Sequence, residues 1–217
     1  MTRFTDNILR RFLCAFFALA VFFPALAQAD SFDDWVRGFW PTARAAGVSS
    51  STYKAAFDGV TPDKTILKSA GSQAEFVRPI WSYLDSAISE KRLEDGKQKL
   101  IDFRQTLDAV EARYGVDRHI VVAIWGMESS YGQGLENPKI VKNVIRSLAT
   151  LAYADSRRQK FGRQQLLAAL NILEHGDIDP AGLTGSWAGA MGHTQFIPTT
   201  YQAYAVDFDG DGRRNIW

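Results

Sequence analysis

Val121-Val-Ala-Ile-Trp-Gly-Met-Glu128-Ser-Ser-Tyr-Gly132 is the stretch around which the rest of the chain can be ordered. Asp117 is a good N-cap, and the helix that it opens would place Ile120, Ile124 and Glu128 in one row. Because the run is otherwise apolar, this helix is predicted to be buried on all sides. Burial disfavours the ionised form of a carboxyl group, so the pKa of Glu128 is predicted to be raised, which suits a general acid. A Glu that turns to solvent at the end of the helix is the alternative interpretation.

A glycine-rich motif follows further along the chain, at Gly189-Ala-Met-Gly-His-Thr-Gln195-Phe-Ile-Pro-Thr-Thr-Tyr201. This motif and Glu128-Ser-Ser-Tyr-Gly132 resemble the two diagnostic motifs of the lytic murein transglycosylases of the B type, glycoside hydrolase family 103. In that family a single catalytic Glu stands in an E-[ST]-x-aromatic-G setting, and the second motif is G-A-M-G-x-x-Q-F-[MI]-P-[ST]. The likeness extends from Phe32 to the last residue, Trp217.

The resemblance implies a mainly α fold, in which an N-terminal helical subdomain (residues 30–115) precedes a lysozyme-like catalytic core (residues 116–217). It also implies that Glu128 protonates the glycosidic oxygen between N-acetylmuramic acid and N-acetylglucosamine. Glu128 would then deprotonate the C6 hydroxyl of muramic acid, which closes a 1,6-anhydro ring. A hydrolase would need a second carboxylate about 5–10 Å away, for which Asp155 is the nearest candidate in sequence. A hydrolytic muramidase and a noncatalytic peptidoglycan-binding fragment stay open as alternatives.

Residues 1–29 have the pattern of a signal peptide. Arg10-Arg11 end a basic region, Phe12 to Phe23 form a short apolar run, and Ala27-Gln-Ala29 is a cleavage site of the small-x-small kind. The apolar run is too short to span a bilayer. Cys14, the one cysteine, lies within this run, so the mature chain has no disulfide. We therefore predict an exported, periplasmic protein with no transmembrane segment in its mature chain.

The charge balance argues against nucleic acid as a partner. The chain carries 25 Lys and Arg and 24 Asp and Glu, and without residues 1–29 these numbers become 22 and 23. A nucleic-acid-binding domain would show a basic surplus. The family resemblance instead implies peptidoglycan glycan strands as the partner, with other cell-wall enzymes as further candidates and no organic cofactor.

Apolar residues recur at helical spacing through most of the chain from Phe32 onward. The pattern predicts a first helix that Pro41 stops and a second that Ser50 or Ser51 caps. It also predicts one longer helix through Leu100, Phe103, Leu107 and Val110, which stops before Gly115. The remaining predicted helices run from Phe76 to Ile88, from Asn143 to Ala154, and from Ser156 to Gly176.

Five residues are predicted to bind the sugar strand. From the pattern alone, Arg157 and Arg158 are more simply two solvated arginines, but the resemblance implies that an arginine pair lines the cleft. Guanidinium groups suit the carboxylates of muramic acid and its peptide. The resemblance also assigns Ser186, Trp187 and Gln195 to the cleft, where Trp187 would offer a face to a pyranose ring. The small residues around them are predicted to let the backbone approach a ligand closely, and His193, at a variable motif position, is assigned no role.

Asp207-Phe-Asp209-Gly-Asp211-Gly212 matches positions 1, 3, 5 and 6 of a calcium-binding loop, and the carbonyl group of Arg213 can serve position 7. A structural Ca²⁺ ion is therefore predicted here, with a metal-free Asp/Gly turn as the alternative. Arg214 stands where an apolar residue is expected, and position 12 falls beyond Trp217. Since the chain ends inside this loop and lacks the family's later Tyr-rich segment, we interpret it as a truncated gene product or fragment.

Overall fold

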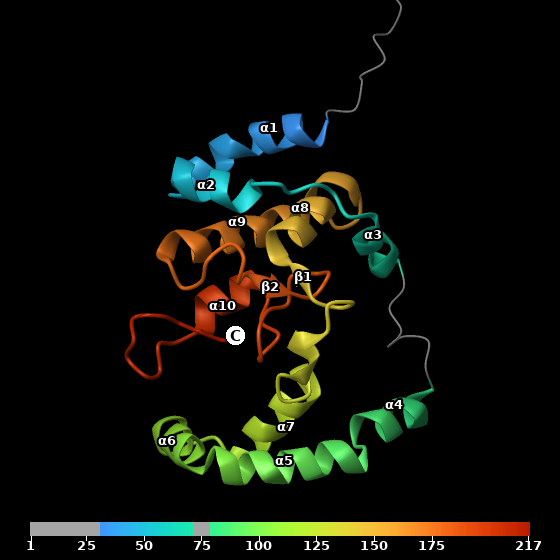
Figure 1. The fold of residues 1–217 in the computed structure, drawn as a ribbon, viewed down its shortest axis with the longest axis vertical. Coiled ribbons are helices and arrows are strands. Elements are labelled where there is room, and N and C mark those ends of the chain that lie inside the picture. The colour runs from blue at the N-terminus through green and yellow to red at the C-terminus, as the bar shows by residue number, and fades with distance from the viewer. Residues whose placement is uncertain (1–30, 72–78) are drawn as a thin grey trace, which may run out of the picture. The chain divides into compact units, whose positions relative to one another are not determined.

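The computed structural model describes residues 31–71 and 79–217 and is shown in Figure 1. The predicted signal peptide (residues 1–29) and Phe76 lie outside the described residues. Helices dominate the described chain, which confirms the predicted mainly α fold. The helices are α1 (Phe32–Ala45), α2 (Ser50–Phe57), α3 (Lys64–Ala70), α4 (Ile80–Ala87), α5 (Glu90–Asp102), α6 (Arg104–Tyr114), α7 (Arg118–Ser129), the 3-10 helix η2 (Gln133–Glu136), α8 (Val144–Ala154), α9 (Gln159–His175) and α10 (Pro198–Tyr204).

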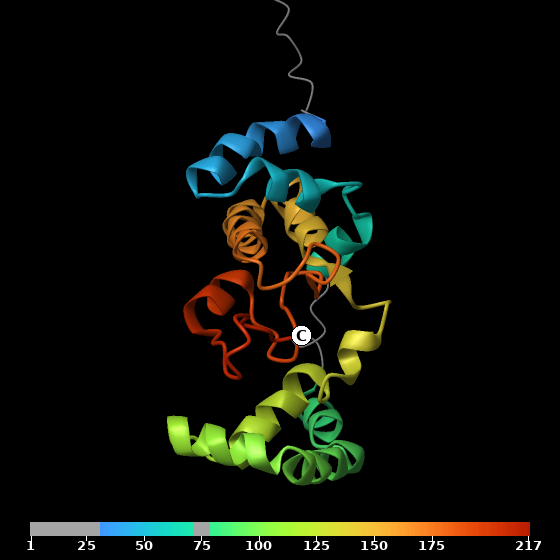
Figure 2. The same ribbon diagram turned by 60° about the vertical axis from the view of Figure 1, so that its left-hand side comes forward.

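Helices α8 and α9 lie side by side at the centre of the main hydrophobic core (Figure 1, Figure 2). Asn143 caps α8 by accepting the amide of Arg146 at 2.9 Å, and Gly176 ends α9 with φ of +77°. A Cβ atom on Gly162 would lie 2.6 Å from the backbone nitrogen of Ala152, so a glycine is needed where α9 approaches α8. Both helices begin and end close to where the sequence predicted. The leucines that fill their contact are fully buried: Leu148, Leu151, Leu166 and Leu170.

Helices α1, α2 and α3 pack against α8 and α9. Phe39 and Tyr53 join the main core, and Ile66 packs with Leu151 in a second cluster. The predicted stop at Pro41 is wrong, because α1 continues to Ala45. Pro41 lies on the exposed face, where water can reach the carbonyl group that loses its backbone donor. The N-cap of α2 is Ser49, one residue before the predicted pair. The domain boundary near residue 115 stays a prediction.

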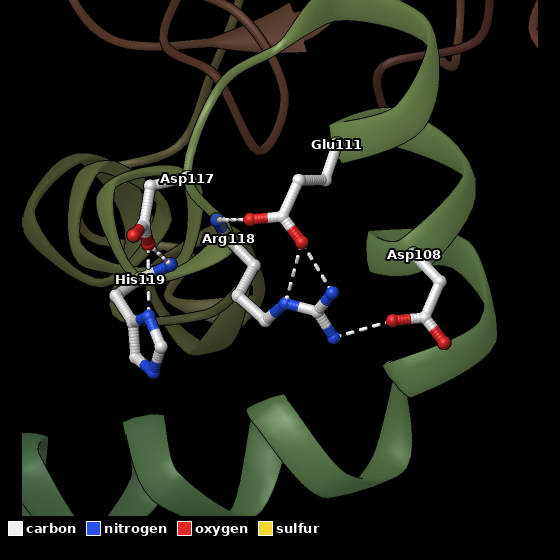
Figure 3. A network of polar contacts seen from close by, with 5 residues as sticks. All are labelled: Asp108, Glu111, Asp117, Arg118 and His119. Carbon is white, nitrogen blue, oxygen red and sulfur yellow. Dashed lines mark hydrogen bonds and ion pairs between the residues drawn. The ribbon is translucent and has the colours of Figure 1, made fainter.

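The segment from α5 to α7 forms a separate small cluster around Leu107, Val122 and Tyr131. The single long helix predicted here is wrong, because Phe103 (φ −106°, ψ 20°) leaves the helical conformation and divides it into α5 and α6. Arg118, at the start of α7, donates to the carboxylates of Glu111 and Asp108 on α6 (Figure 3). This polar contact joins the start of α7 to α6, in addition to the apolar contact of the two helices through Leu107 and Val122.

Figure 3 also shows how α7 begins: the side chain of Asp117 accepts the amide of His119 at 2.7 Å, as the predicted N-cap requires.

Two short strands lie between the helices. β1 (Lys142–Asn143) pairs antiparallel with β2 (Thr184–Gly185), with Lys142 opposite Gly185. The pairing fixes the start of the glycine-rich loop (residues 185–196) beside the start of α8. Within the described ranges, no helix is long and apolar enough to cross a membrane.

Candidate active site

Glu128 lines a pocket of about 90 Å³ together with Ser186 and Gln195. Glu128 comes from the last turn of α7, while Ser186 and Gln195 come from the two ends of the glycine-rich loop. The structure therefore brings together three of the residues predicted for the site, from segments far apart in the sequence. The remaining lining residues are Ser129, Gly134, Leu135, Ile140, Val141 and Gly185.

The predicted all-round burial of α7 is wrong. One face is buried, through Val122, Gly126 and Ser129, whereas Ile120 and Ile124 are each 55% exposed. Glu128 belongs to the same row as these two isoleucines and is exposed as well. A helix of apolar composition is buried only where other elements pack against it. The elements that pack against α7 include α5 and α6, and they leave Ile120 and Ile124 exposed. The burial from which the acid role was predicted is thus absent, and that role depends on the pocket instead.

The turn after Glu128 is held in an unusual backbone conformation. Ser130, Tyr131 and Gly132 have φ angles of 50°, 58° and 91°, and non-glycine residues adopt such values uncommonly. The turn is stable because the Tyr131 side chain reaches back between α5 and α7. Its hydroxyl donates to the carbonyl of Arg92 at 3.0 Å.

Tyr131 fits because both helices carry a glycine at the contact. A Cβ atom would lie 2.6 Å from the Tyr131 hydroxyl if built on Gly96, and 2.5 Å from the ring if built on Gly126. Glycine within a helix costs about 1 kcal/mol relative to Ala, so these two glycines were the sequence signal for the contact. Tyr131 thereby sets the position of the last turn of α7, which carries Glu128.

The glycines of the loop are needed for its packing against the rest of the protein, while Gly185 also lines the pocket, so the predicted close approach of a ligand to this backbone stays a prediction. A Cβ atom on Gly185 would lie 2.3 Å from the carbonyl oxygen of Ala190, and one on Gly192 would lie 2.3 Å from that of Ile216. On Gly189 it would lie 2.8 Å from Leu148. The small residues therefore allow the loop to pack tightly against the protein itself.

Ser186 and Gln195 both make hydrogen bonds within the loop. The Ser186 hydroxyl oxygen accepts the amides of Ala188 and Ala190 at 3.3 and 3.0 Å, which leaves its O–H as a donor. The side-chain amide of Gln195 donates to the carbonyl of Gly192 at 2.9 Å. Gln195 also has a positive φ of 50°, a strained backbone conformation that sets the direction in which its side chain leaves the loop.

Arg157, Arg158 and Trp187 are not among the residues that line this pocket. The Arg158 guanidinium lies 5.5 Å from the Trp187 ring centroid and 3.5 Å from the carboxylate of Asp155. Trp187 also packs against the cluster of Ile66 and Leu151. The pattern did not reveal this pairing, in which Arg158 lies over the Trp187 ring while Arg157 is exposed.

Asp155, the candidate second carboxylate, is buried and does not line the pocket. Its carboxylate accepts the backbone amides of Arg157 and Arg158 at 3.0 and 3.2 Å and so closes the turn before α9. Asp155 is therefore already used in the fold of this turn.

His193, at the variable position of the second motif, contacts the Glu128 helix. Its Nδ1 accepts the indole N–H of Trp125 at 2.8 Å. Burial lowers the pKa of His193 below its ordinary value. Nothing in the spacing of the motif indicated this contact.

The predicted calcium ligands lie close together. Carboxylate oxygens of Asp207, Asp209 and Asp211 all fall within 4.8 Å of one another. Asp207 accepts the amides of Gly212 and Gly210 at 2.9 and 2.8 Å, and these bonds hold its pKa below the usual range. An all-oxygen set of this kind fits a hard cation such as Ca²⁺.

The helical fold, the lone pocket carboxylate and the opposing glycine-rich loop define the chain as a lysozyme-like protein, as predicted. The chain belongs to the transglycosylase SLT domain family, which it matches over residues 31–217. The resemblance drawn from the two motifs is thereby confirmed.

Three known proteins illustrate the similarity. SltB3 from Pseudomonas aeruginosa, solved in complex with NAG-anhNAM-pentapeptide, is 53% identical, with a TM-score of 0.81 over 87% of this chain and 49% of that chain. Membrane-bound lytic murein transglycosylase B of Escherichia coli (strain K12) is 31% identical over 160 residues, which are 74% of this chain and 42% of the relative. Escherichia coli SLT35, solved in complex with calcium, is 26% identical, with a TM-score of 0.72 over 89% of this chain and 59% of that chain. This chain thus spans about half the length of these relatives.

Proposed function

We propose that this chain carries the catalytic site of a lytic murein transglycosylase, with Glu128 as the single acid and base. The carboxylic acid of Glu128 would protonate the glycosidic oxygen as the bond from C1 of N-acetylmuramic acid breaks. The resulting carboxylate would take the proton of the C6 hydroxyl, whose oxygen bonds to C1. The product is a 1,6-anhydro sugar, and no water is consumed.

One observation carries this proposal: of the described residues that line the pocket, only Glu128 has a carboxylate. Hydrolytic glycosidases of the retaining and inverting kinds use a pair. Asp155 is an unsuitable second member because it closes the turn before α9. The anhydro sugar named in the SltB3 complex supports the same reaction for this chain.

The test is Glu128→Gln, which keeps the side-chain shape but cannot donate and recover a proton. We expect less than about a hundredth of the parent's murein cleavage, since acid and base assistance contributes about 10²–10⁴-fold. Glu136→Gln, an exposed residue in η2 that does not line the pocket, is the matched control.

Mass spectrometry of the muropeptides distinguishes the alternatives. Anhydro ends, one water lighter than reducing ends, support the transglycosylase. Reducing ends would mean a hydrolytic muramidase, and binding without cleavage would mean a noncatalytic module.

For substrate binding, we propose that Ser186 and Gln195 contact the sugar in the pocket. The neighbouring surface of Trp187, Arg157 and Arg158 would bind the adjoining sugar and its carboxylates. A pyranose stacked on Trp187 would have to displace or share the ring with Arg158, which already lies over it.

We further propose that Asp207, Asp209, Asp211 and the carbonyl group of Arg213 bind Ca²⁺ in a structural role, as the calcium complex of SLT35 suggests. These groups give about four oxygens, fewer than the 6–8 that Ca²⁺ normally takes, so binding should be weak. Millimolar Ca²⁺ should raise the melting temperature slightly, and Asp209→Ala should abolish the rise. An equal rise with Mg²⁺, or one that survives the substitution, would count against the site.

Residues 1–29 would direct export, which places the protein with its murein substrate in the periplasm. The mass of the protein recovered from a periplasmic extract tests this proposal, since cleavage after Ala29 gives a chain that begins at Asp30.

A further inference from the structure

A hydrogen bond joins the helix that carries Glu128 to the loop that carries Gln195. Trp125 lies on α7 one turn before Glu128, and its indole Nε1 donates to Nδ1 of His193 at 2.8 Å. His193 lies in the glycine-rich loop two residues before Gln195. The two sides of the pocket are therefore linked directly by one side-chain pair.

The surroundings of the imidazole are shaped to hold it. A Cβ atom on Gly132 would lie 2.3 Å from Cε1 of His193, so the ring occupies the space that a side chain at residue 132 would fill. The backbone amide of His193 donates to the carbonyl of Ile216 at 2.8 Å. The Trp125 ring is itself fixed by edge contacts with Phe103 and Tyr131. Both partners of the hydrogen bond are thus positioned independently of it.

We propose that His193 is a positioning residue, which holds Gln195 and Ser186 opposite Glu128 by accepting the hydrogen bond of Trp125. This role rests on the proposed function of the pocket. His193 does not line the pocket, and its effect on the reaction is exerted through the placement of the loop.

The hydrogen bond requires an unprotonated Nδ1, because an imidazolium has no acceptor. Burial lowers the pKa of His193, and the positive charge of Lys99 on α5 lowers it further, while a hydrogen bond with the backbone of Trp217 acts in the opposite direction. The α7 neighbour, Trp125, is uncharged. His193 is therefore neutral at pH 7. When the pH falls below the ordinary histidine pKa of about 6.5, protonation should convert Nδ1 of His193 from an acceptor to a donor.

Four variants test the contact through activity. His193→Leu and Trp125→Phe each remove one partner, and each should lower murein cleavage about tenfold. The double variant should lose little more than either single one, because the two substitutions remove the same bond. In His193→Asn the Oδ1 atom takes the place of Nδ1 but does not titrate. This variant should recover most of the rate at pH 7 and lose the part of the acid-side decline that belongs to His193.

His175→Asn is the matched control, since His175 is exposed and its Nδ1 lies 2.6 Å from the carbonyl of Asn171. It should leave the rate and the pH profile as in the parent. Additive losses in the double variant, or an Asn variant as slow as the Leu variant, would overturn the positioning role.

A second measurement is independent of activity. The chain has six tryptophans, and ¹⁵N NMR gives each indole N–H a signal, with Trp125→Phe assigning the one of interest. That signal should move with a midpoint below pH 6.5 in the parent and stay fixed in His193→Asn. A signal that does not titrate in the parent would contradict the proposal. Absence of murein cleavage together with a titrating signal would instead mean that the proposed function fails while the contact is real.

Discussion

Helix α8 and helix α7 have almost equal lengths and similar apolar sequences, yet they are packed very differently. Eight of the eleven residues of α8 are buried, compared with three of the twelve residues of α7. Helix α8 lies against α9, α2 and α3, whereas α7 meets α5, α6 and η2. The residue proposed to carry out the chemistry is thus on the less covered of the two helices.

The difference shows two ways to position a helix. Helix α8 is held by continuous apolar contact, so that no single side chain decides its place. Helix α7 depends on a few specific contacts: Tyr131 between Gly96 and Gly126, the bond from Trp125 to His193, and the ion pairs of Arg118. A helix held in this way leaves Glu128 accessible while its last turn stays in a defined position.

The largest effect should come from a cavity in the α8–α9 contact. Leu170→Ala should lower the free energy of unfolding by about 2–5 kcal/mol, because Leu170 is fully buried and its neighbours can collapse only in part. Ile124→Ala on α7 should change it by less than about 0.5 kcal/mol, since that side chain is 55% exposed. Urea unfolding of both variants measures the contrast, and similar losses would refute the distinction between the two helices.

A smaller loss in the free energy of unfolding is expected when the polar contact between Asp177, just after α9, and Arg214 is removed. Arg214 donates to the buried carboxylate of Asp177 through Nη2 at 2.6 Å and its backbone amide at 3.1 Å. Burial of Asp177 acts to raise its pKa, but the hydrogen bonds and charge of Arg214 outweigh it and hold the pKa below the usual range. Asp177→Asn should cost about 1.5–3 kcal/mol at pH 7.

The pH dependence of that cost follows from the depressed pKa. The stabilisation is present above the unfolded-state pKa of about 3.9 and disappears as the pH falls through the lower folded-state value. Unfolding at pH 7, 4 and 3 should therefore show parent and variant converging in acid. Asp58→Asn, an exposed control, should differ little from the parent at each pH.

The smallest of the three effects on the free energy of unfolding is expected for substitutions of two helical glycines, Gly126 and Gly38. Gly126→Ala places a methyl group 2.5 Å from the Tyr131 ring and should cost about 1–3 kcal/mol. Gly38→Ala on α1 meets nothing within 4 Å and should stabilise the protein by about 0.5–1 kcal/mol. Opposite signs in thermal unfolding would confirm that Gly126 is a packing requirement. A stabilising Gly126→Ala would show that Tyr131 can move aside.

The sequence predicted the parts of the fold that local chemistry decides. Asn143 and Gly176 mark the outer ends of the α8–α9 pair, and the spacing of Asp207, Asp209 and Asp211 brings their carboxylates together. In the site, the family resemblance named Glu128, Ser186 and Gln195, which line one pocket, while their roles stay predictions.

What the sequence did not predict depends on partners distant along the chain. The apolar pattern of α7 does not determine how many faces of the helix pack against other elements. The prediction that Glu128 is buried was wrong for this reason. The continuous pattern across Phe103 hides a break, because periodicity is the same on both sides of it. The contacts of His193 with Trp125 and of Arg158 with Trp187 join separate segments, for which a single sequence contains no spacing rule.

The contact of Arg214 with Asp177 also has a consequence for the proposed calcium loop. Residues 206–213 run between two anchored ends, since Ala205 donates to the carbonyl of Tyr201 on one side and Arg214 is tied to Asp177 on the other. The conformational entropy of closing this loop is therefore lost when the protein folds, before any ion arrives. Preorganisation of this kind favours binding without adding a ligand. The affinity of the proposed site for calcium should accordingly depend on Asp177, a residue outside the proposed set of ligands.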